Sequence, residues 1–395
     1  MKILFVAMGE SIHTERWISQ ISDQNWEIHL APSTYSSSRR RQIKNVFFHT
    51  DFKVVKDKKS GLARYTGLNL FVNRIITLFK VCRDKIWPDY RAQQLNRLIK
   101  QIKPDIIHSL EFQSAGYLVS RAKQLYDSGQ FPKWIATNWG NDIYFFARFK
   151  DHQAKIKTLL ETCDYYSCEC NRDVCLAKNH GFKGKVLPVY PNTGGFDLKK
   201  VWSWRQKGLT SQRRIILIKG YHGIFGRALL ALKALEQCVD VLSGYKIVFY
   251  SVDNKSVLIP AIKDFTLKTG VPVEIVPYGS SHEKILRMHG KARISIGLNV
   301  SDGVSTAFLE ALVMGSFPVQ SNTACVDEWI ENGQTGMIVP PENIKKIAQA
   351  IRLALTDNSM VDAGVKKNWQ TAKKRLDYLF LKNKTVKFYN EVAKN

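Results

Sequence analysis

The stretch from residue 294 to residue 341 constrains the fold of this chain more than any other. It opens with an apolar run at 294–298, which is typical of a buried strand in a parallel sheet. A turn at 301–303 and a helix ending at Gly315 follow, and a second strand begins at residue 317. The order strand, turn, helix, strand predicts one unit of a parallel α/β sheet.

The N-terminus of this helix has the features of a phosphate-binding site. Ser305 or Thr306 can cap it, and unpaired N–H groups with a partial positive charge are expected there, at the carboxyl end of a strand. Asp302 precedes the helix and Glu310 lies about two turns further along, so both carboxylates can face one cleft. By themselves, the two acidic residues could equally cap the helix and face water.

The same stretch resembles the donor-binding signature of retaining GT-B glycosyltransferases of family 4. The residues that carry the resemblance are Asp302, Gly303, Glu310, Gly315, Pro318, Glu328, Gly333, Gly336 and Pro340. It implies that Glu310 binds the ribose hydroxyls of a nucleotide and that Asp302 contacts the transferred sugar. Asp302 stands where Glu is commoner, which shortens this contact by one methylene. The resemblance also implies that cationic side chains replace a metal.

Length and composition are those of a protein with two domains. The chain has 395 residues, of which 45% are hydrophobic. No stretch approaches the roughly 18 apolar residues that span a bilayer, and the short apolar run at 1–9 predicts a first strand rather than a signal peptide, which favours the cytoplasm.

The cysteine cluster from Cys163 to Cys175 lacks paired C-x2-C spacing, so we expect buried small residues rather than a metal site.

The net charge of +25 indicates an anionic partner. Sixteen Lys and Arg stand against four Asp between Arg39 and Lys100, so about half of the excess lies there. An amphipathic helix with basic flanks is predicted at 68–79, and it could either lie on a membrane or pack on its own domain. We expect its apolar face to pack on the domain, and the charge excess to attract an anionic membrane surface or an anionic acceptor. No nucleic-acid motif is present.

The N-terminal part alternates strands and helices. A strand at 2–6, a turn containing Gly9, a helix at 12–21 and a strand at 26–30 predict a βαβ unit without G-x-G-x-x-G. Its first loop also resembles that of many family 4 enzymes, where the loop borders the acceptor and the donor phosphate. The resemblance therefore makes His13 a candidate, and Arg16 either a candidate or a solvated helix residue.

Two further strands are expected to end in polar residues. His108 ends the strand at 104–108, and Asp142 follows the strand at 133–137. Because neighbouring parallel strands end at one edge of the sheet, His108 and Asp142 are predicted to converge on the cleft. Many family 4 members carry a His after the second strand, but here Asn138 or Trp139 stands at that place. Asp142 could replace it or could cap a helix.

The second domain begins after a linker, and its first loop has the form of a phosphate cradle. The run at 191–197 resembles the interdomain linker of the family. A strand at 214–218 leads through Lys219 and Gly220 into a glycine loop at 221–227 and then a helix. Family 4 enzymes usually hold the leaving diphosphate here with an Arg and a Lys. The candidates are Lys219, Gly220, Tyr221 and Arg227 for the phosphates, and Pro277 and Tyr278 for the nucleobase.

Together these expectations describe an α/β protein of GT-B architecture, with two Rossmann-like domains facing a central cleft. We expect an acceptor-binding domain at 1–192 with a basic insert at about 35–100, a donor-binding domain at 193–375, and a C-terminal helix at 376–395 that crosses back to the first domain.

The expected function is retaining transfer of a sugar from a UDP- rather than a GDP-sugar to a glycan or lipid-linked acceptor. We expect this transfer to serve surface polysaccharide assembly, in the cytoplasm or on the inner face of the membrane, without a cofactor or a metal. The alternatives are a nucleotide-sugar epimerase, a non-enzymatic binder of polyanions or nucleic acid, and a catalytically inactive GT-B scaffold, given Asp302 and the missing His.

Overall fold

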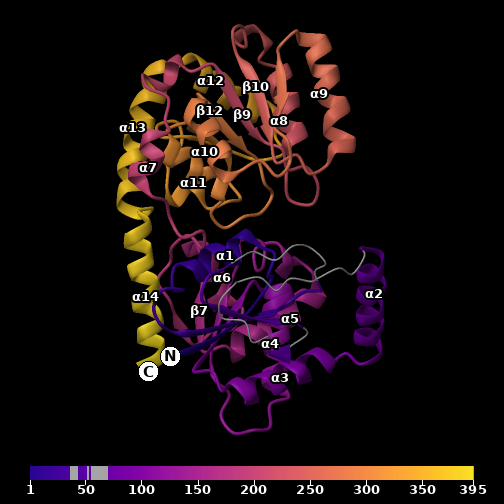
Figure 1. The fold of residues 1–395 in the computed structure, drawn as a ribbon. Helices are drawn as coiled ribbons and strands as arrows, with labels where there is room; N and C mark the ends of the chain where they lie inside the picture. The colour runs from indigo at the N-terminus through magenta and orange to yellow at the C-terminus, as the bar shows by residue number, and fades with distance from the viewer. Residues whose placement is uncertain (36–42, 51–52, 55–69, 395) are drawn as a thin grey trace. The chain divides into compact units, whose positions relative to one another are not determined.

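The computed structural model describes residues 1–35, 43–50, 53–54 and 70–394, and the chain forms two compact units (Figure 1). The first unit comprises Met1–Gly194 and Leu381–Asn395, and the second comprises Gly195–Phe380. The boundaries expected from the sequence were 192 and 376. Each unit is an α/β sheet of the Rossmann-like type, with helices on both faces.

The sheet of the first unit has the strand order β4-β3-β2-β1-β5-β6-β7-β8. The strands are β1 (Lys2–Ala7), β2 (Glu27–Pro32), β3 (Val46–Thr50), β4 (Lys53–Val54), β5 (Ile106–Leu110), β6 (Lys133–Thr137), β7 (Tyr165–Ser167) and β8 (Lys185–Val186). All neighbouring strands are parallel except β3 and β4. In the central pair, Phe5 of β1 lies opposite His108 of β5. Both strands are nearly continuous apolar runs, as strands covered on both faces must be.

Helices cover both faces of this sheet, and the alternation of side chains along β1 shows which helices lie on which face. Leu4 and Val6 pack with α3 (Tyr90–Ile102), α4 (Tyr117–Gln124) and α5 (Lys150–Thr162). Ile3 and Phe5 point to the other face and pack with α1 (Ile12–Ser19) and α14 (Tyr378–Lys394). The remaining elements are α2 (Leu70–Ile86), a π-helix at Phe112–Gly116, a 3-10 turn at Phe146–Arg148 and α6 (Asn171–Asn179).

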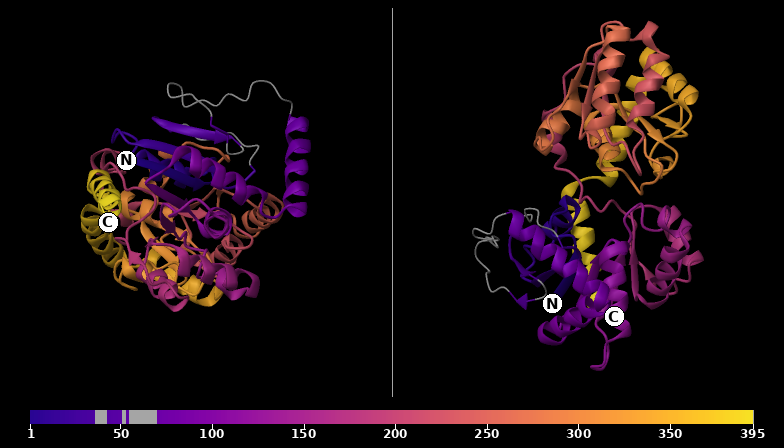
Figure 2. Two further views of the ribbon diagram at one scale, coloured as in Figure 1. Left: turned by 90° about the horizontal axis from the view of Figure 1, so that it is seen from below. Right: turned by 90° about the vertical axis from the view of Figure 1, so that its right-hand side faces the viewer.

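Helix α2 lies at the edge of the first unit (Figures 1 and 2). Its side chains are described from residue 78 onward, and several apolar ones face solvent there. Leu78 is 63% exposed, Phe79 72% and Ile86 67%, and Trp87 directly after the helix is 60% exposed. The prediction that the apolar face packs on the domain is therefore wrong for this part of the helix, because no described element covers these side chains.

The sheet of the second unit has the order β11-β10-β9-β12-β13-β14, and all of its strands are parallel. The strands are β9 (Ile215–Lys219), β10 (Lys246–Tyr250), β11 (Val273–Ile275), β12 (Ile294–Gly297), β13 (Phe317–Ser321) and β14 (Met337–Val339). The helices are α7 (Leu198–Ser203), α8 (Ala228–Glu236), α9 (Lys255–Thr269), α10 (His282–Lys291), α11 (Thr306–Met314), α12 (Ile344–Thr356) and α13 (Asn358–Arg375), with 3-10 turns at Thr210–Gln212, Val239–Val241 and Val326–Glu328. The stretch at 294–341 forms the predicted strand, turn, helix and strand.

The end of the chain forms two helices, α13 and α14, and α14 begins at Tyr378, close to the start expected at residue 376. Helix α13 stops at Arg375 because the backbone at 376–378 bonds to Phe196: the Phe196 N–H donates to the Leu376 carbonyl at 2.8 Å, and the Tyr378 N–H donates to the Phe196 carbonyl at 3.0 Å. Helix α14 then adds apolar side chains such as Phe388 to the core of the first unit. None of the helices in the described part of the chain has the length and apolar character needed to span a bilayer.

Candidate functional site

The carboxylate of Glu310 is buried on α11 and is held by two histidines of α10. Glu310 Oε1 lies 2.7 Å from His282 Nε2, and Oε2 lies 3.6 Å from His289 Nε2. The side chains of Glu310 and His289 are 6% and 1% exposed, whereas that of His282 is 42% exposed. Because α11 begins at Thr306, Glu310 lies about one turn into the helix and not two.

These contacts keep the Glu310 carboxyl ionised. Burial alone would raise its pKa, but the hydrogen bond with His282 and the nearby ring of His289 outweigh burial and hold the pKa well below the usual range. His289 is itself fixed by Ser295, whose hydroxyl lies 2.9 Å from Nδ1 and 2.6 Å from the Ser316 hydroxyl. The sequence analysis missed both histidines. His282 and His289 are seven residues apart, about two helical turns, so they lie on one face of α10. This spacing was the signal in the sequence that both could contact one partner.

The N-terminus of α11 carries an unpartnered hydroxyl. Ser305 is the N-cap residue, but its side chain accepts no capping bond, and its Oγ is buried without a hydrogen-bond partner in the described part of the chain. Asp302 instead stabilises the preceding turn, where its carboxylate accepts from the Gly303 N–H at 3.0 Å and from Asn299 Nδ2 at 3.1 Å. Thr306 is half-buried at the first helical position. The free N–H groups of this helix end and the Ser305 hydroxyl can donate to an anion.

The glycine loop after β9 is held in shape by Arg227. The Arg227 guanidinium donates to the carbonyls of Gly223 at 2.8 Å and Gly226 at 3.0 Å, and its Nε is 2.9 Å from Glu342 Oε1. A Cβ at Gly226 would lie 2.1 Å from the Tyr221 carbonyl oxygen, so the closed loop requires glycine there. Arg227 is thus engaged by the protein itself, which the sequence did not indicate.

The other candidates of the second unit lie at the ends of β9 and β11. Lys219 ends β9, and its Nζ lies 4.3 Å from the centroid of the Tyr221 ring. Gly220 follows and packs against β10 and the residues after it, since a Cβ there would meet the Tyr250 carbonyl oxygen at 3.0 Å. Pro277 and Tyr278 form an exposed turn directly before α10, and Tyr278 is 77% exposed. Lys219 forms no ion pair with any described residue.

In the first unit, Asp142 lies buried beyond the carboxyl end of β6. Its Oδ2 accepts from the Trp139 N–H at 2.7 Å and from the Phe112 N–H at 2.9 Å. It thus binds the π-helix that follows β5 to the turn that follows β6, as a capping residue does. Burial raises the pKa of Asp142 well above its usual range, and the nearby negative charge of Glu111 raises it further.

Glu111 is a residue that the sequence analysis missed. It directly follows β5, and its carboxylate accepts from the N–H groups of Ser114 at 2.9 Å and Ala115 at 2.5 Å. Its φ of 76° is unusual for a residue other than glycine and is a local strain. Burial raises the pKa of Glu111. A polar residue directly after a strand is a candidate site residue. Glu111 was missed because the strand was predicted to end at residue 108.

The prediction that His108 converges with Asp142 at the strand ends is wrong. Strand β5 continues to Leu110, so His108 lies inside it and is fully buried. Its ring nitrogens lie 2.6 Å from the Tyr389 hydroxyl and 2.6 Å from the Thr137 hydroxyl. Burial lowers the pKa of His108 to about 3. This histidine is a neutral core residue that cannot reach a substrate.

The first loop of the chain lies next to the end of β6. Gly9 is part of a turn that the Ser11 N–H closes by donating to the Met8 carbonyl at 3.1 Å. Ser11 caps α1, and the ring of His13 in its first turn packs edge-on against Trp139 at 5.4 Å between centroids. The structure therefore brings His13 to the tip of β6, where the turn containing Asp142 begins.

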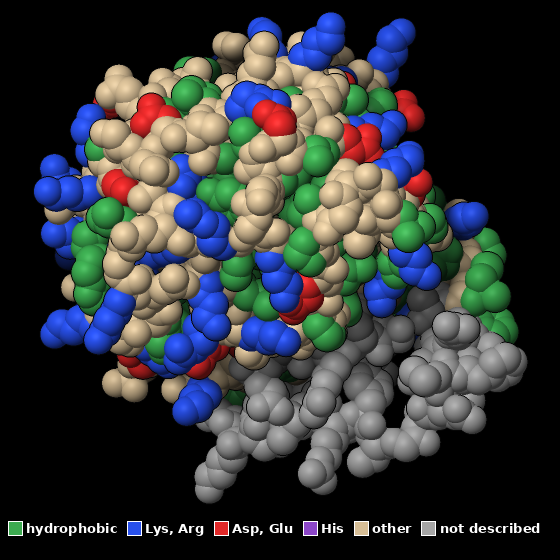
Figure 3. Space-filling model, turned by 90° about the horizontal axis from the view of Figure 1, so that it is seen from above, with side chains coloured by type: hydrophobic (Ala, Val, Ile, Leu, Met, Phe, Trp, Pro, Cys, Tyr) green, Lys and Arg blue, Asp and Glu red, His purple; other side chains and the backbone are tan. Residues whose placement is uncertain are grey.

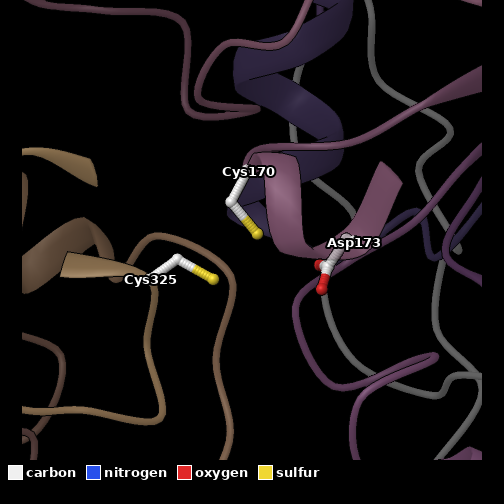
Figure 4. A group of neighbouring side chains, drawn as sticks. All are labelled: Cys170, Asp173 and Cys325. Atoms are coloured by element: carbon white, nitrogen blue, oxygen red, sulfur yellow. The ribbon is translucent and has the colours of Figure 1, made fainter. Parts of the chain in front are cut away.

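The cysteine-rich segment of the first unit contains no disulfide. Cys163, Cys168 and Cys170 are buried, as predicted, whereas Cys175 is exposed. Figure 4 draws Cys170 and Asp173 at the start of α6, together with Cys325 of the second unit. Asp173 accepts from Asn138 Nδ2 at 2.7 Å and from Arg172 Nε at 2.9 Å. Within either unit taken by itself, the described residues gather no three His, Cys, Asp or Glu ligand atoms close enough to hold a metal.

Two family models match most of the chain. The model described as glycosyl transferases group 1 matches residues 231–383, and the model described as glycosyl transferase 4-like matches residues 2–90 and 87–168. Comparison with curated protein sequences gives no match.

Solved structures share the fold over the whole chain. Sucrose-phosphate synthase from Thermosynechococcus elongatus has a TM-score of 0.72 and 12% identity, covering 99% of both chains. Anabaena HepE in complex with UDP-glucose has a TM-score of 0.68 and 12% identity, covering 99% of this chain and 100% of that one. A glycosyltransferase from Rickettsia africae has a TM-score of 0.66 and 13% identity, covering 100% and 99%. The architecture is GT-B.

Proposed function

The chain belongs to the GT-B glycosyltransferases of the group 1 and 4-like families, and we propose that it transfers a sugar from a UDP-sugar to a hydroxyl group with retention of configuration. The observation that carries the proposal is the buried, ionised carboxylate of Glu310 on the helix whose N-terminus carries the free Ser305 hydroxyl. A carboxylate is the acceptor that two ribose hydroxyls require, and a helix N-terminus binds phosphate.

The choice of UDP rests on a solved structure that shares the fold, whereas the place of the base is inferred from this chain. Anabaena HepE, which shares the fold, was crystallised with UDP-glucose and with UDP. In this chain the exposed turn at Pro277 and Tyr278 directly precedes α10, which contributes His282 to the Glu310 carboxylate. We infer that the base lies at this turn when the ribose is bound to Glu310, and that Asp302 contacts the sugar.

The barrier to transfer is departure of the diphosphate from an oxocarbenium-like centre, so the enzyme must stabilise developing negative charge. Lys219, which has no ion-pair partner in the described part of the chain, and the N-terminus of α11 supply positive charge for this. Arg227 binds Glu342 and the loop carbonyls, so we assign it chiefly to positioning the glycine loop. The proposal includes no metal and no cofactor.

We propose that the first unit binds the acceptor, a glycan or a lipid-linked saccharide in surface polysaccharide assembly. The observation in favour of a membrane-bound acceptor is the exposed apolar end of α2, where Leu78, Phe79 and Ile86 face solvent among Lys80, Arg83 and Lys85. Apolar side chains flanked by basic ones are the pattern of a helix that lies on an anionic membrane surface.

Epimerisation of a nucleotide sugar is the second candidate function. It is favoured by Glu111 and Asp142, because buried carboxyl groups with raised pKa are suited to proton transfer. An epimerase would release UDP or an isomerised UDP-sugar without any acceptor. A retaining transferase incubated with its donor and water releases the sugar first as the anomer present in the donor, which proton NMR distinguishes.

The deciding experiment is thermal unfolding with UDP and with GDP, on the wild type, Glu310→Ala and the control Glu331→Ala, an exposed carboxylate of the same unit. Nucleotide at 100 times its dissociation constant adds about 2.7 kcal/mol of stability. We expect UDP to stabilise the wild type and the control but not Glu310→Ala. Stabilisation by GDP alone would contradict the UDP assignment, and no shift with either nucleotide would contradict the donor site.

A further inference from the structure

A cavity of about 410 Å³ lies in the second unit, away from the residues discussed so far. It is bordered by α7, the loop at 206–209 that follows it, and α13, which run next to each other in Figure 1. The lining side chains used below are Trp202, Arg205, Lys207, Arg213, Lys366 and Trp369. Its volume is in the range of small-molecule sites.

One wall of the cavity is aromatic. The rings of Trp202 and Trp369 pack at 4.8 Å between centroids with an angle of 32° between their planes. The guanidinium of Arg205 lies 4.6 Å from the Trp202 centroid and 4.2 Å from that of Trp369, which holds the pair in place. Trp202 is nevertheless 53% exposed, so a fixed indole surface faces solvent.

The other walls carry more positive than negative charge, because Arg205, Lys207, Arg213 and Lys366 stand against one carboxylate, that of Asp362. Arg205 donates to the Val313 carbonyl at 2.8 Å, and Arg213 donates to the Gly315 carbonyl at 2.5 Å. Neither guanidinium lies within ion-pair distance of a carboxylate among the described residues. Arg213 is 3% exposed, and its Nε has no hydrogen-bond partner there. Asp362, the one acid among the described lining residues, is bound by the backbone and hydroxyl of Ser211.

Two exposed lysines, Lys207 and Lys366, add to this charge. Lys and Arg side chains are spread over the face of the molecule seen in Figure 3, whereas in the cavity they gather around one hollow with an aromatic wall. Arg213 is buried, and Asp362 attracts it without forming an ion pair with it. A buried guanidinium with so little counter-charge is costly, and an anion that enters the cavity would relieve that cost. The cavity is therefore suited to a ligand that carries an anionic group and also an apolar face that can stack on an indole ring.

We propose that the cavity binds an acidic sugar unit of a glycan, one that carries a carboxylate or a phosphate. The apolar face of the sugar ring would stack on Trp202, and the acidic group would bind Arg213 with Lys207 and Lys366. Only the preference for a saccharide rests on the proposed function. Single-stranded nucleic acid needs a groove of cations that follows its backbone, whereas these cations surround one cavity.

The cavity is distinct from the proposed donor site. Arg205 and Arg213 bind the carbonyls at the C-terminal end of α11, whereas Ser305 lies at its N-terminus. The nine residues of α11 separate these ends by about 13 Å. A ligand in the cavity therefore lies at the opposite end of α11 from Ser305, and the two sites can be titrated separately.

The test is calorimetric titration of the whole protein at low ionic strength with trigalacturonate, with the neutral trisaccharide maltotriose and with an oligothymidylate. The variants are Trp202→Ala and the double substitution Lys207→Glu with Lys366→Glu. The matched control is Lys367→Glu, an exposed lysine of α13 outside the cavity. We expect trigalacturonate to bind at least about tenfold more tightly than maltotriose, which corresponds to about 1.4 kcal/mol. Each cavity variant should weaken that binding by about tenfold, and the control should not.

Three results would overturn the inference: no binding of trigalacturonate, equal binding by wild type and double variant, or tighter cavity-dependent binding of the oligothymidylate. Unfolding midpoints close to that of the wild type show that the variants are folded. The UDP thermal shift, measured on the same samples, separates the two proposals. A retained UDP shift without trigalacturonate binding contradicts the cavity alone, and trigalacturonate binding without a UDP shift contradicts the donor site alone.

Discussion

The Nδ1 atom of His108 lies 2.6 Å from the hydroxyl oxygen of Tyr389, which joins β5 to α14 across 281 residues of sequence. Trp17 Nε1 donates to the same hydroxyl at 2.8 Å. Because Trp17 already donates to the Tyr389 oxygen, we assign the Tyr389 hydroxyl as the donor to Nδ1. The proton of the neutral ring is then assigned to Nε2, which donates to Thr137 Oγ1 at 2.6 Å. This chain of buried hydrogen bonds holds the C-terminal helix against the sheet of the first unit.

The first prediction concerns the pH dependence of this core. The pKa of His108 is lowered to about 3 by burial, against about 6.5 in the unfolded chain. The stabilising contribution is complete above pH 6.5 and is lost as the pH falls towards 3, because only the unfolded state binds the proton in that range. Below pH 6.5, we expect the free energy of opening at β1 and β5 to fall by up to about 1.4 kcal/mol per pH unit. Amide hydrogen exchange at pH 5 to 8 measures this, and the slope should shrink in His108→Gln. An unchanged slope would contradict the assignment.

The second prediction concerns Asp142, whose pKa is raised by burial and by Glu111. For a carboxyl with a raised pKa, the stabilising contribution is complete below the unfolded pKa of about 4 and is lost as the pH rises through the folded value. Asp142→Asn, which keeps an acceptor oxygen without a charge, should therefore stabilise the protein more at pH 8 than at pH 5. Asp142→Ala should destabilise it by about 1–3 kcal/mol, because two backbone N–H groups lose their acceptor. Thermal unfolding at pH 5 and pH 8 tests both, and destabilisation by Asn at pH 8 would refute the account.

The third prediction is energetic coupling between Glu310 and His289, which lie 3.6 Å apart in the core of the second unit. Changing either member removes one polar contact of a buried group, although Glu310 keeps His282 and His289 keeps Ser295. Glu310→Gln and His289→Ala should therefore each be destabilising. The double variant should lose less free energy of unfolding than the two single variants together, by about 0.5–3 kcal/mol. Urea unfolding measures the cycle. Glu310→Gln combined with the exposed Lys345→Ala serves as the control, and it should be additive within about 0.5 kcal/mol.

The fourth prediction compares two glycines of the loop after β9. A Cβ at Gly226 would lie 2.1 Å from the Tyr221 carbonyl oxygen, whereas a Cβ at Gly223 meets nothing within 4 Å. Gly226→Ala should therefore displace the loop and reduce the UDP thermal shift by about 1.4 kcal/mol or more, a factor of ten in affinity. Gly223→Ala should leave the shift unchanged. Equal shifts in both variants would show that loop shape does not matter for the nucleotide.

The fifth prediction concerns membrane binding through α2. Leu78 and Phe79 are 63% and 72% exposed, and a large apolar side chain gains about 1.5–3 kcal/mol when it leaves water. The protein should co-sediment with vesicles containing phosphatidylglycerol, and Leu78→Ser with Phe79→Ser should abolish this. The control is Leu267→Ser, because Leu267 is 86% exposed on α9 of the second unit. Binding that survives the double substitution would place the contact elsewhere.

Much of the fold was predictable because its signals are local. Apolar runs of strand length, Gly315 after a helix and the loop at 220–227 each act within a few residues, and the structure has the expected elements at these places. The residues at which strands and helices end were harder to predict than the elements themselves. Strand β5 extends two residues beyond the predicted end, and this shift placed His108 at an edge that Glu111 in fact occupies.

The alternation of strands and helices can be read from the sequence, as can the family signature at 294–341 and the place of Glu310 on the helix within it. What each charged group binds becomes known only from the folded chain: Glu310 binds His282 from a different helix, Arg227 binds Glu342 from 115 residues away, and His108 is covered by Tyr389. The physical reason is that burial and hydrogen-bond partners depend on which segments meet in three dimensions. Local periodicity specifies the segments but not the pairs of side chains that come together when the segments pack.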